Sequence, residues 1–256
     1  MAKRLKMSNG VKAIILAAGK STRLRPFTNH KPKVMLEIDG KPILEYNLNI
    51  AKKARVRDIY INLYHAAENI RDYFGSGTKF GVNINYSREK NILGSAGAVK
   101  KIAKDFPRFK ETFFVVYGDN FTNCNLSKLL KAHKKNKGIA TIAIFDRTKN
   151  KNSGIAGGRV LYDKKTFKIK SFRETSSAES NFVNAGIYVA EPEILKYIPK
   201  DKFYDFGKDL FPLLIKKRID IYAYLMPKNE YVFGIDTVEC YKKAQNFWAG
   251  IKKQNK

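Results

Sequence analysis

The stretch VKAIILAAGKSTRLRPFTNHKPKVML, residues 11–36, joins an apolar run to a loop of small and basic residues. Residues 11–17 have the length and the Ile and Val content of a buried strand. The small residues that follow let backbone N–H groups approach an anion closely. Within the loop, Arg23 offers a planar fork for phosphate binding and Lys33 offers a point charge. The stretch therefore predicts a phosphate-binding loop at the end of a buried strand.

Apolar runs and amphipathic stretches alternate along the first half of the chain. The runs have the length and composition of strands and lie at residues 11–17, 58–65, 82–87, 112–119 and 140–146. The stretches between them have helical periodicity and lie at residues 42–54, 65–75, 94–106 and 126–137. This alternation predicts an α/β fold with a Rossmann-like, mostly parallel sheet flanked by helices.

The pattern changes after residue 147. A polar loop precedes a predicted β-hairpin at 159–172, and further strands are predicted at 182–190, 219–226 and 231–235. Because no linker rich in Pro, Gly or Ser interrupts the chain, we expect a single domain. Its inserted, β-rich second half would cover the carboxyl edge of the strands, which is where ligands of open α/β sheets bind.

Composition limits the class of protein. The chain has 256 residues, 44% of them hydrophobic, which is enough for a large core and excludes global disorder. It has no apolar run of membrane-spanning length and no cleavable signal-peptide pattern, so we expect a cytoplasmic protein without a membrane partner. Two cysteines, Cys124 and Cys240, are too few for a disulfide framework or a four-cysteine zinc site.

The net charge is unusually positive. Fifty Lys and Arg residues against 23 Asp and Glu give a formal charge of +27. Two interpretations are open: lysines solvated on helix faces, or an anionic partner such as a phosphorylated small molecule, an acidic membrane surface or nucleic acid. The cations are spread along the chain, and only short basic ends at 1–10 and 251–256 lie outside the predicted domain. Without basic residues interleaved with aromatics on one face, we expect no nucleic-acid partner.

Two familiar phosphate-binding motifs are excluded. Gly19, Lys20 and Ser21 mimic the end of a P-loop, but Ile14 stands where that motif requires a glycine. The chain also lacks a Gly-x-Gly-x-x-Gly fingerprint. Neither a P-loop NTPase nor a dinucleotide oxidoreductase is therefore expected.

Two aspartates follow predicted strands. Asp119 ends the run VVYGD, and Asp236 lies in GIDT between a strand and a helix. An acid at the carboxyl end of a strand, close to a phosphate loop, is suited to bind Mg²⁺. Asp236 has an alternative role as a helix N-cap, since Glu239 follows three residues later.

These residues together resemble a known family. LAAGKSTRLRPFTNHKPKVML, residues 16–36, is similar to the signature of the sugar-1-phosphate nucleotidyltransferases, or NDP-sugar pyrophosphorylases. Further segments resemble later motifs of that family in the same order: KPILEYNL (41–48), LGSAGAV (93–99), YGDN (117–120), SGIAGGRVLYD (153–163), FRE (172–174) and FVNAGIYV (182–189). The resemblance spans roughly residues 11–248.

The resemblance implies an enzyme that makes an NDP-sugar and pyrophosphate from an NTP and a sugar 1-phosphate, with Mg²⁺ as cofactor. It implies a nucleotide-binding part at 11–147 and a sugar-binding part at 148–250. By the same resemblance, Arg23, Lys33 and Asp119 would be catalytic, and Asp119 and Asp236 would hold the metal. The nucleotide would meet Arg23, Lys33 and the backbone of Leu16, Ala17, Ala18, Gly19 and Gly94. The sugar phosphate would meet Gly154, Glu174 and Asn184.

One departure from the family concerns the sugar phosphate. The family lysine that meets it falls on Thr175 here, so another cation is needed. Because side chains alternate along a strand, Lys170 would share the face of Glu174, provided that the strand has no bulge. We therefore expect Lys170, ahead of Arg173, to bind the sugar phosphate.

The base and the sugar are less well defined by the motifs. The segment from Glu89 to Gly97 is more similar to members that use GTP with mannose or heptose 1-phosphate than to thymidylyl members. Alternatives remain open: a thymidylyl-, uridylyl- or cytidylyltransferase acting on another sugar or polyol phosphate, or a catalytically silent relative that binds nucleotide-sugar and regulates a partner. Homo-oligomer formation is also open.

Overall fold

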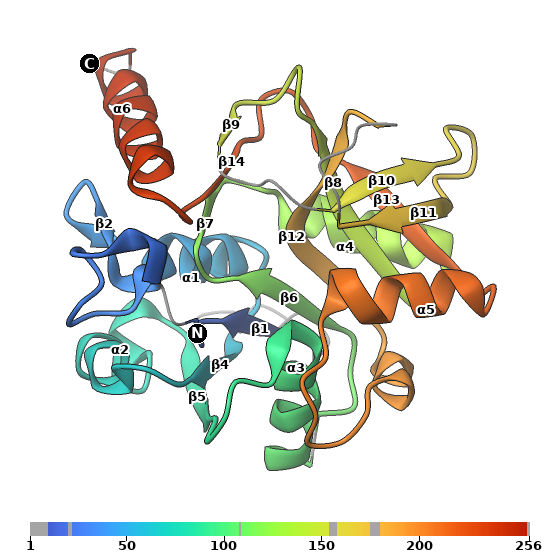
Figure 1. Cartoon of the computed structure of the whole chain (residues 1–256), viewed down its shortest axis with the longest axis horizontal. Helices are drawn as coiled ribbons and strands as arrows, with labels where there is room; N and C mark the ends of the chain where they lie inside the picture. Colours follow the sequence, from blue (N-terminus) through green and yellow to red (C-terminus); the bar gives the residue numbers. More distant parts are fainter. Residues whose placement is uncertain (1–9, 20–21, 108, 154–157, 175–179, 255–256) are drawn as a thin grey trace, which may run out of the picture.

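A computed structural model describes residues 10–254, apart from 20–21, 108, 154–157 and 175–179. Within these residues, the central feature is a nine-stranded sheet with the path β11-β10-β12-β6-β1-β4-β5 (Figure 1). Its first part is parallel and consists of β1 (Lys12–Leu16), β4 (Asp58–Leu63), β5 (Asn83–Arg88) and β6 (Phe113–Tyr117). The predicted α/β class, with a mostly parallel sheet flanked by helices, is confirmed.

The second half of the chain extends the same sheet. Strand β12 (Phe182–Ala190) runs antiparallel between β6 and β8 (Ala140–Asp146), and β13 (Ile221–Leu225) pairs parallel with β8. The predicted hairpin is formed by β10 (Arg159–Tyr162) and β11 (Ile169–Arg173), which pair antiparallel at the edge. The two halves of the chain therefore share one sheet.

Helices cover both faces of the sheet. Alternate residues of β1 point to opposite sides, so Ala13 and Ile15 join one apolar cluster and Ile14 joins another. The first cluster includes α1 (Ile43–Lys53), α2 (Ala67–Phe74) and α4 (Leu126–Asn136). The second includes α3 (Gly94–Asp105) and α5 (Phe211–Lys216). No helix in the described ranges combines the length and the apolarity needed to cross a bilayer.

A small second sheet lies beyond the carboxyl end of β6. It consists of β7 (Asn120–Thr122), β14 (Val232–Gly234) and β9 (Asn152–Ser153), and β7 directly follows Asp119. Gly234 pairs with Asn120, and the N–H of Ile235 donates to the carbonyl of Asp119 at 3.1 Å. This pairing sets Asp119 and Asp236 side by side although they lie 117 positions apart in the sequence.

Helix α6 (Val238–Gln254) closes a third apolar cluster beside the small sheet. The two-residue strands β2 (Glu37–Ile38) and β3 (Lys41–Pro42) form a separate hairpin before α1. The helical segment before β13 begins as a π-helical turn, Phe206–Leu210, and continues as α5. Pro212 lacks the N–H that a regular helix would use at this point, which accounts for the irregular start.

Candidate active site

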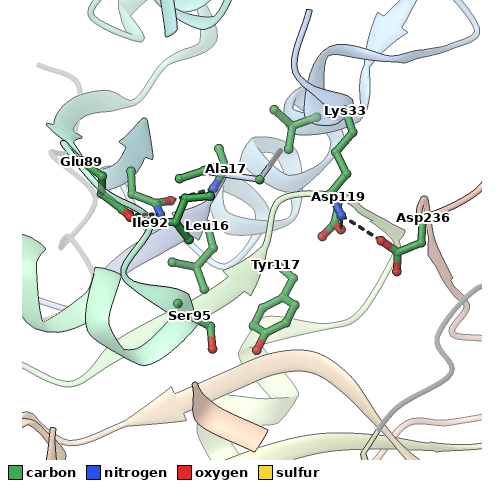
Figure 2. A pocket seen from close by; sticks show the side chains of 14 residues that line it. Leu16, Ala17, Lys33, Glu89, Ile92, Ser95, Tyr117, Asp119 and Asp236 are labelled. Atoms are coloured by element: carbon green, nitrogen blue, oxygen red, sulfur yellow. Dashed lines mark hydrogen bonds and ion pairs between the residues drawn. The ribbon is translucent and has the colours of Figure 1, made fainter. Parts of the chain in front are cut away.

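A pocket of about 300 Å³ opens at the carboxyl ends of β1 and β6 (Figure 2). Six residues predicted to bind the nucleotide line it: Leu16, Ala17, Ala18, Gly19, Lys33 and Gly94. The two predicted metal ligands, Asp119 and Asp236, also line it. The structure thus brings these residues, from four separate segments, to one pocket.

Close approach of β1 and β6 requires a glycine at position 118. The N–H of Gly118 donates to the carbonyl of Leu16 at 2.9 Å. A Cβ atom at this position would lie 2.7 Å from that same oxygen, which is closer than carbon and oxygen can pack. Glycine therefore lets β6 carry Asp119 to the rim of the pocket.

Four charged side chains meet at one end of the pocket. The Lys33 ammonium contacts Asp119 Oδ2 and lies 2.9 Å from Asp236 Oδ1, as Figure 2 shows. Arg23 does not line the pocket, but its Nη2 atom lies 3.1 Å from the same oxygen of Asp236. Burial alone would lower the pKa of Lys33, but the carboxylates of Asp119 and Asp236 raise it well above its ordinary value. Lys33 is therefore a permanent cation.

Asp236 is not the cap of α6. The hydroxyl of Thr237 accepts a hydrogen bond from the N–H of Cys240 at 3.2 Å, one residue before the helix begins at Val238. Thr237 therefore has the N-cap role, and the alternative role for Asp236 is wrong. The carboxylate of Asp236 is directed instead at Lys33 and Arg23.

The residues present fit a divalent cation. Asp119 and Asp236 already converge on one positive charge, and carboxylate oxygens are preferred ligands of Mg²⁺. Among the described residues, no group of three or more His, Cys, Asp or Glu side chains could enclose a metal. A metal here would therefore take its other ligands from water and from phosphate oxygens, which is usual for Mg²⁺ at phosphate-binding sites.

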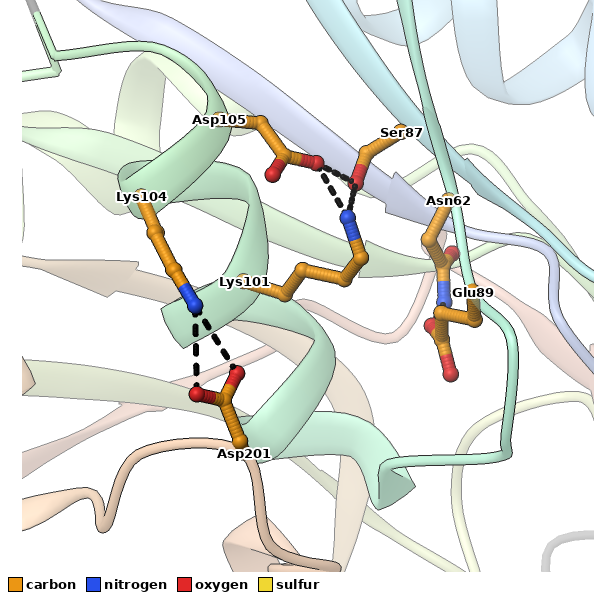
Figure 3. Close-up of polar contacts among 7 residues, drawn as sticks. All are labelled: Asn62, Ser87, Glu89, Lys101, Lys104, Asp105 and Asp201. Carbon is orange, nitrogen blue, oxygen red and sulfur yellow. Dashed lines mark hydrogen bonds and ion pairs between the residues drawn. The ribbon is translucent and has the colours of Figure 1, made fainter.

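A buried hydrogen-bond chain lies at the other end of the pocket. Asn62 Oδ1 accepts from the N–H of Ala17 at 2.7 Å, and Asn62 Nδ2 donates to Glu89 Oε1 at 2.6 Å. The second oxygen of Glu89 accepts from the N–H of Leu93 at 2.9 Å. Figure 3 shows the Asn62 and Glu89 side chains facing each other. Burial raises the pKa of Glu89, and the hydrogen bonds from Asn62 and Leu93 oppose that shift.

Asn62 and Glu89 line the pocket but were not among the predicted site residues. The signal in the sequence is Asn62 itself, a polar residue inside the apolar run DIYINLYH. A buried amide in a strand requires partners, and here the partners are the signature loop and Glu89.

Asn184, one of the predicted sugar residues, lies close to the pocket. Tyr117 lines the pocket, and its ring meets the ring of Tyr188 with centroids 5.8 Å apart. Asn184 Nδ2 donates to the Tyr188 hydroxyl at 2.9 Å, and Asn184 Oδ1 accepts from the N–H of Gly186 at 2.9 Å. Asn184 is therefore connected to the pocket through two tyrosines.

Glu174 lies against the turn that precedes α5. A Cβ atom at Gly207 would come within 2.0 Å of Glu174 Oε1, so only glycine leaves room for this carboxylate. Burial and the nearby carboxylate of Asp205 raise the pKa of Glu174, and the charge of Lys208 opposes that shift. Gly154 and Thr175 fall outside the described residues.

The premise that favoured Lys170 is wrong. Strand pairing shifts between Leu161 and Tyr162, which face Ser171 and Ile169, so Lys170 occupies a β-bulge. Phe172 is buried, whereas the Lys170 side chain is 66% exposed and its ammonium lies 2.9 Å from Asp163 in the hairpin turn. Four residues of strand, roughly 13 Å, separate Lys170 from Glu174. The bulge breaks the alternation on which the prediction depended.

The fold and this pocket define an α/β protein with a charged cluster at the carboxyl edge of its sheet. The chain belongs to the nucleotidyl transferase family, whose model matches residues 12–249. The resemblance in the sequence to sugar-1-phosphate nucleotidyltransferases is thereby confirmed.

Named relatives and a solved structure agree with this assignment. The chain is 40% identical to the UTP–glucose-1-phosphate uridylyltransferase of Synechocystis sp., over 94% of this chain and 63% of that protein. It is 27% identical to the D-glycero-alpha-D-manno-heptose 1-phosphate guanylyltransferase of Aneurinibacillus thermoaerophilus, over 92% and 97% of the two chains. The crystal structure of HddC from Yersinia pseudotuberculosis complexed with GMP-PN superimposes with a TM-score of 0.75 at 25% identity, covering 93% of this chain and 99% of that one. The chain thus spans about three fifths of the Synechocystis protein and nearly all of the heptose enzyme.

Proposed function

We propose that this chain transfers a nucleotidyl group from an NTP to a sugar 1-phosphate and releases pyrophosphate. The observation that carries the proposal is the convergence of Lys33, Asp119, Asp236 and Arg23 at one end of the pocket. In the reaction, an oxygen of the sugar phosphate forms a bond to the α-phosphorus. The bond from that phosphorus to the bridging oxygen breaks, and pyrophosphate leaves with the electron pair.

Each charged residue has a role that follows from its chemistry. Asp119 and Asp236 would hold Mg²⁺, which would neutralise phosphate charge and orient both substrates. Arg23 would bind the outer phosphates and stabilise the leaving pyrophosphate, and Lys33 would contact the α-phosphate region. No protein nucleophile is required, because positioning and charge stabilisation suffice for this transfer.

We further propose GTP as the nucleotide, on the basis of Glu89. Its two oxygens are fixed by Asn62 and Leu93, yet each retains a lone pair. Guanine presents two adjacent donors, N1–H and N2–H₂, on its Watson–Crick edge, and a carboxylate can accept from both. Uracil presents one donor between two carbonyl oxygens, which a carboxylate would repel.

UTP is the second candidate, because the Synechocystis relative at 40% identity is named for UTP and glucose 1-phosphate. Uracil would be accepted only by a protonated Glu89, which presents one donor and one acceptor to it. Mannose and heptose 1-phosphates are the favoured acceptors if GTP is used, and glucose 1-phosphate is favoured if UTP is used.

A matrix assay tests these proposals. Five NTPs are combined with mannose, heptose, glucose and other sugar 1-phosphates, and pyrophosphate release is measured with Mg²⁺ present. GTP should give the highest kcat/KM, and Glu89→Gln should lower it for GTP while lowering it less, or raising it, for UTP. A conservative control is Glu239→Gln on the exposed side of α6, which should leave the nucleotide preference unchanged. Failure of every pair to release pyrophosphate would refute the proposed function.

At the sugar end, we propose that Asn184 and Glu174 contact the sugar, together with Gly154. The connection of Asn184 to Tyr117 supports this assignment. In place of Lys170, Lys208 is the cation proposed to assist there, because it follows Gly207, whose backbone lies against the Glu174 carboxylate.

A further inference from the structure

We infer that Lys33 is a tethered substitute for the divalent cation: without nucleotide, its ammonium bridges Asp119 and Asp236 and keeps free metal ions out. The inference rests on the proposed function, since it concerns the metal that the reaction would use. The inference also predicts an order of binding, in which the metal ion binds to the two carboxylates only together with the nucleotide.

The geometry brings three segments to one ammonium group. Asp119 follows β6, Asp236 precedes α6, and Lys33 begins the short 3₁₀ helix Lys33–Met35. Lys33 Nζ contacts Asp119 Oδ2 and lies 2.9 Å from Asp236 Oδ1. The carboxylate oxygens that would ligate a metal are thus already directed at a cation.

The charges of the cluster balance without a metal. Lys33 and Arg23 carry two positive charges, and Asp119 and Asp236 carry two negative ones. A metal ion arriving alone would compete with two cations already paired with the carboxylates and leave excess positive charge in a half-buried site. A triphosphate brings more negative charge than one divalent ion neutralises, so it gives Lys33 and Arg23 new partners. Metal binding to the carboxylates should therefore be weak until the nucleotide arrives.

At Lys33 this exchange requires movement of the side chain but not of the backbone. Its backbone is fixed, because Val34 and Met35 are buried and the N–H of Leu36 donates to the Lys33 carbonyl at 3.1 Å. The ammonium, in contrast, is carried on a flexible four-carbon stem. Rotation of that stem can transfer it from carboxylate to phosphate oxygens within the pocket.

Binding of Mn²⁺ to the nucleotide-free protein, followed by electron paramagnetic resonance, tests the inference without any turnover. Lys33→Met should bind Mn²⁺ at least about tenfold more tightly than the wild type, equivalent to about 1.4 kcal/mol. Lys31→Met is the matched control: Lys31 is two residues away, is 41% exposed, and lies 4.0 Å from Glu37. It should bind Mn²⁺ as the wild type does. Equal affinities in Lys33→Met and the wild type would overturn the inference.

A second pair of variants applies if Lys33→Met does not fold with two carboxylates that only Arg23 balances. Asp236→Asn removes one of them, so Asp236→Asn is compared with the double variant Asp236→Asn/Lys33→Met. The double variant should bind Mn²⁺ more tightly than Asp236→Asn, through the remaining carboxylate of Asp119. Equal affinities of these two variants would contradict the inference.

The two proposals fail separately. If NDP-sugar is formed but Lys33→Met gains no Mn²⁺ affinity, the reaction stands and the substitute-cation role is refuted. If Mn²⁺ affinity rises but no NTP and sugar 1-phosphate pair reacts, the role of Lys33 stands and the proposed function is refuted.

Discussion

Polar side chains gather at both edges of the central sheet, but they are arranged differently. At the carboxyl edge, Lys33, Asp119 and Asp236 face a pocket and balance one another's charges. At the opposite edge, His133 of α4 lies 2.9 Å from Thr141 Oγ1 through Nδ1 and 2.9 Å from Glu191 Oε1 through Nε2. Thr112 also donates to that carboxylate.

We expect the carboxyl-edge cluster to serve catalysis and the network at the opposite edge to stabilise the fold. The network around His133 links α4 to the starts of β6 and β8, and His133 is 1% exposed. The carboxyl-edge cluster instead meets solvent, and its partners can be exchanged for ligands. Changes at the carboxyl edge should therefore remove activity and spare the fold, whereas changes at the opposite edge should do the reverse.

The largest effect is expected at the two aspartates. Asp119→Asn and Asp236→Asn should each lower kcat roughly a thousandfold, about 4 kcal/mol, because the metal would lose a charged ligand. Thermal unfolding should change little, and EDTA should abolish wild-type turnover. Asp201→Asn, at an exposed pair with Lys104, is the control and should be fully active. Full activity of Asp119→Asn would contradict the claim that the carboxyl-edge cluster is required for catalysis.

The cations of the same cluster should come next. Arg23→Ala and Lys33→Ala should lower kcat by roughly 10²–10³, about 3–4 kcal/mol, since each would stabilise charge on the phosphates. Lys31→Ala removes an exposed charge from the same loop and should matter little. Equal and mild effects for all three in steady-state kinetics would mean that the loop is only a solvated basic segment.

A smaller effect is expected at the sugar end. Lys208→Ala should raise the KM for the sugar phosphate roughly tenfold and spare that for the NTP, as loss of one charged contact of about 1.5 kcal/mol would do. Lys170→Ala should leave both constants unchanged, since its ammonium pairs with Asp163 in the hairpin turn. The opposite pattern would restore Lys170 as the sugar-phosphate cation.

The smallest effect on activity is expected at the opposite edge. Burial lowers the pKa of His133 below its ordinary value of 6.5, although Glu191 opposes the shift. The unfolded chain therefore binds the extra proton more readily, so stability is present above about pH 6.5 and is lost as the pH falls below it. Urea midpoints measured from pH 7.5 to pH 5 should fall in the wild type and fall less in His133→Asn. A wild-type stability that rises on acidification would show that Glu191 dominates.

Sequence patterns were sufficient where the site is local. The loop at 16–33 and the acid after β6 follow directly from strands, so Leu16, Lys33 and Asp119 could be placed at one edge. Local patterns give Asp236 two alternative roles, because its position depends on the pairing of β7 with β14, which no local pattern encodes.

Sequence reasoning was weakest where geometry depends on irregular backbone. The bulge in β11 puts Lys170 out of register with Glu174, and strand alternation cannot anticipate a bulge. Glu89 could not be identified as a site residue from the sequence, because a carboxylate in a loop is common. Its role depends on the hydrogen bond from Asn62 of a neighbouring strand.

Isotope transfer tests the central claim most directly, with the NTP and sugar 1-phosphate that the substrate matrix selects. The NTP is labelled with ³²P at either the α or the γ phosphate, and products of the wild type and Asp119→Asn are separated. We expect the α label in NDP-sugar and the γ label in pyrophosphate, only with the sugar phosphate present, and we expect Asp119→Asn to form neither product. Release of the γ label as orthophosphate, or unchanged transfer by Asp119→Asn, would contradict it.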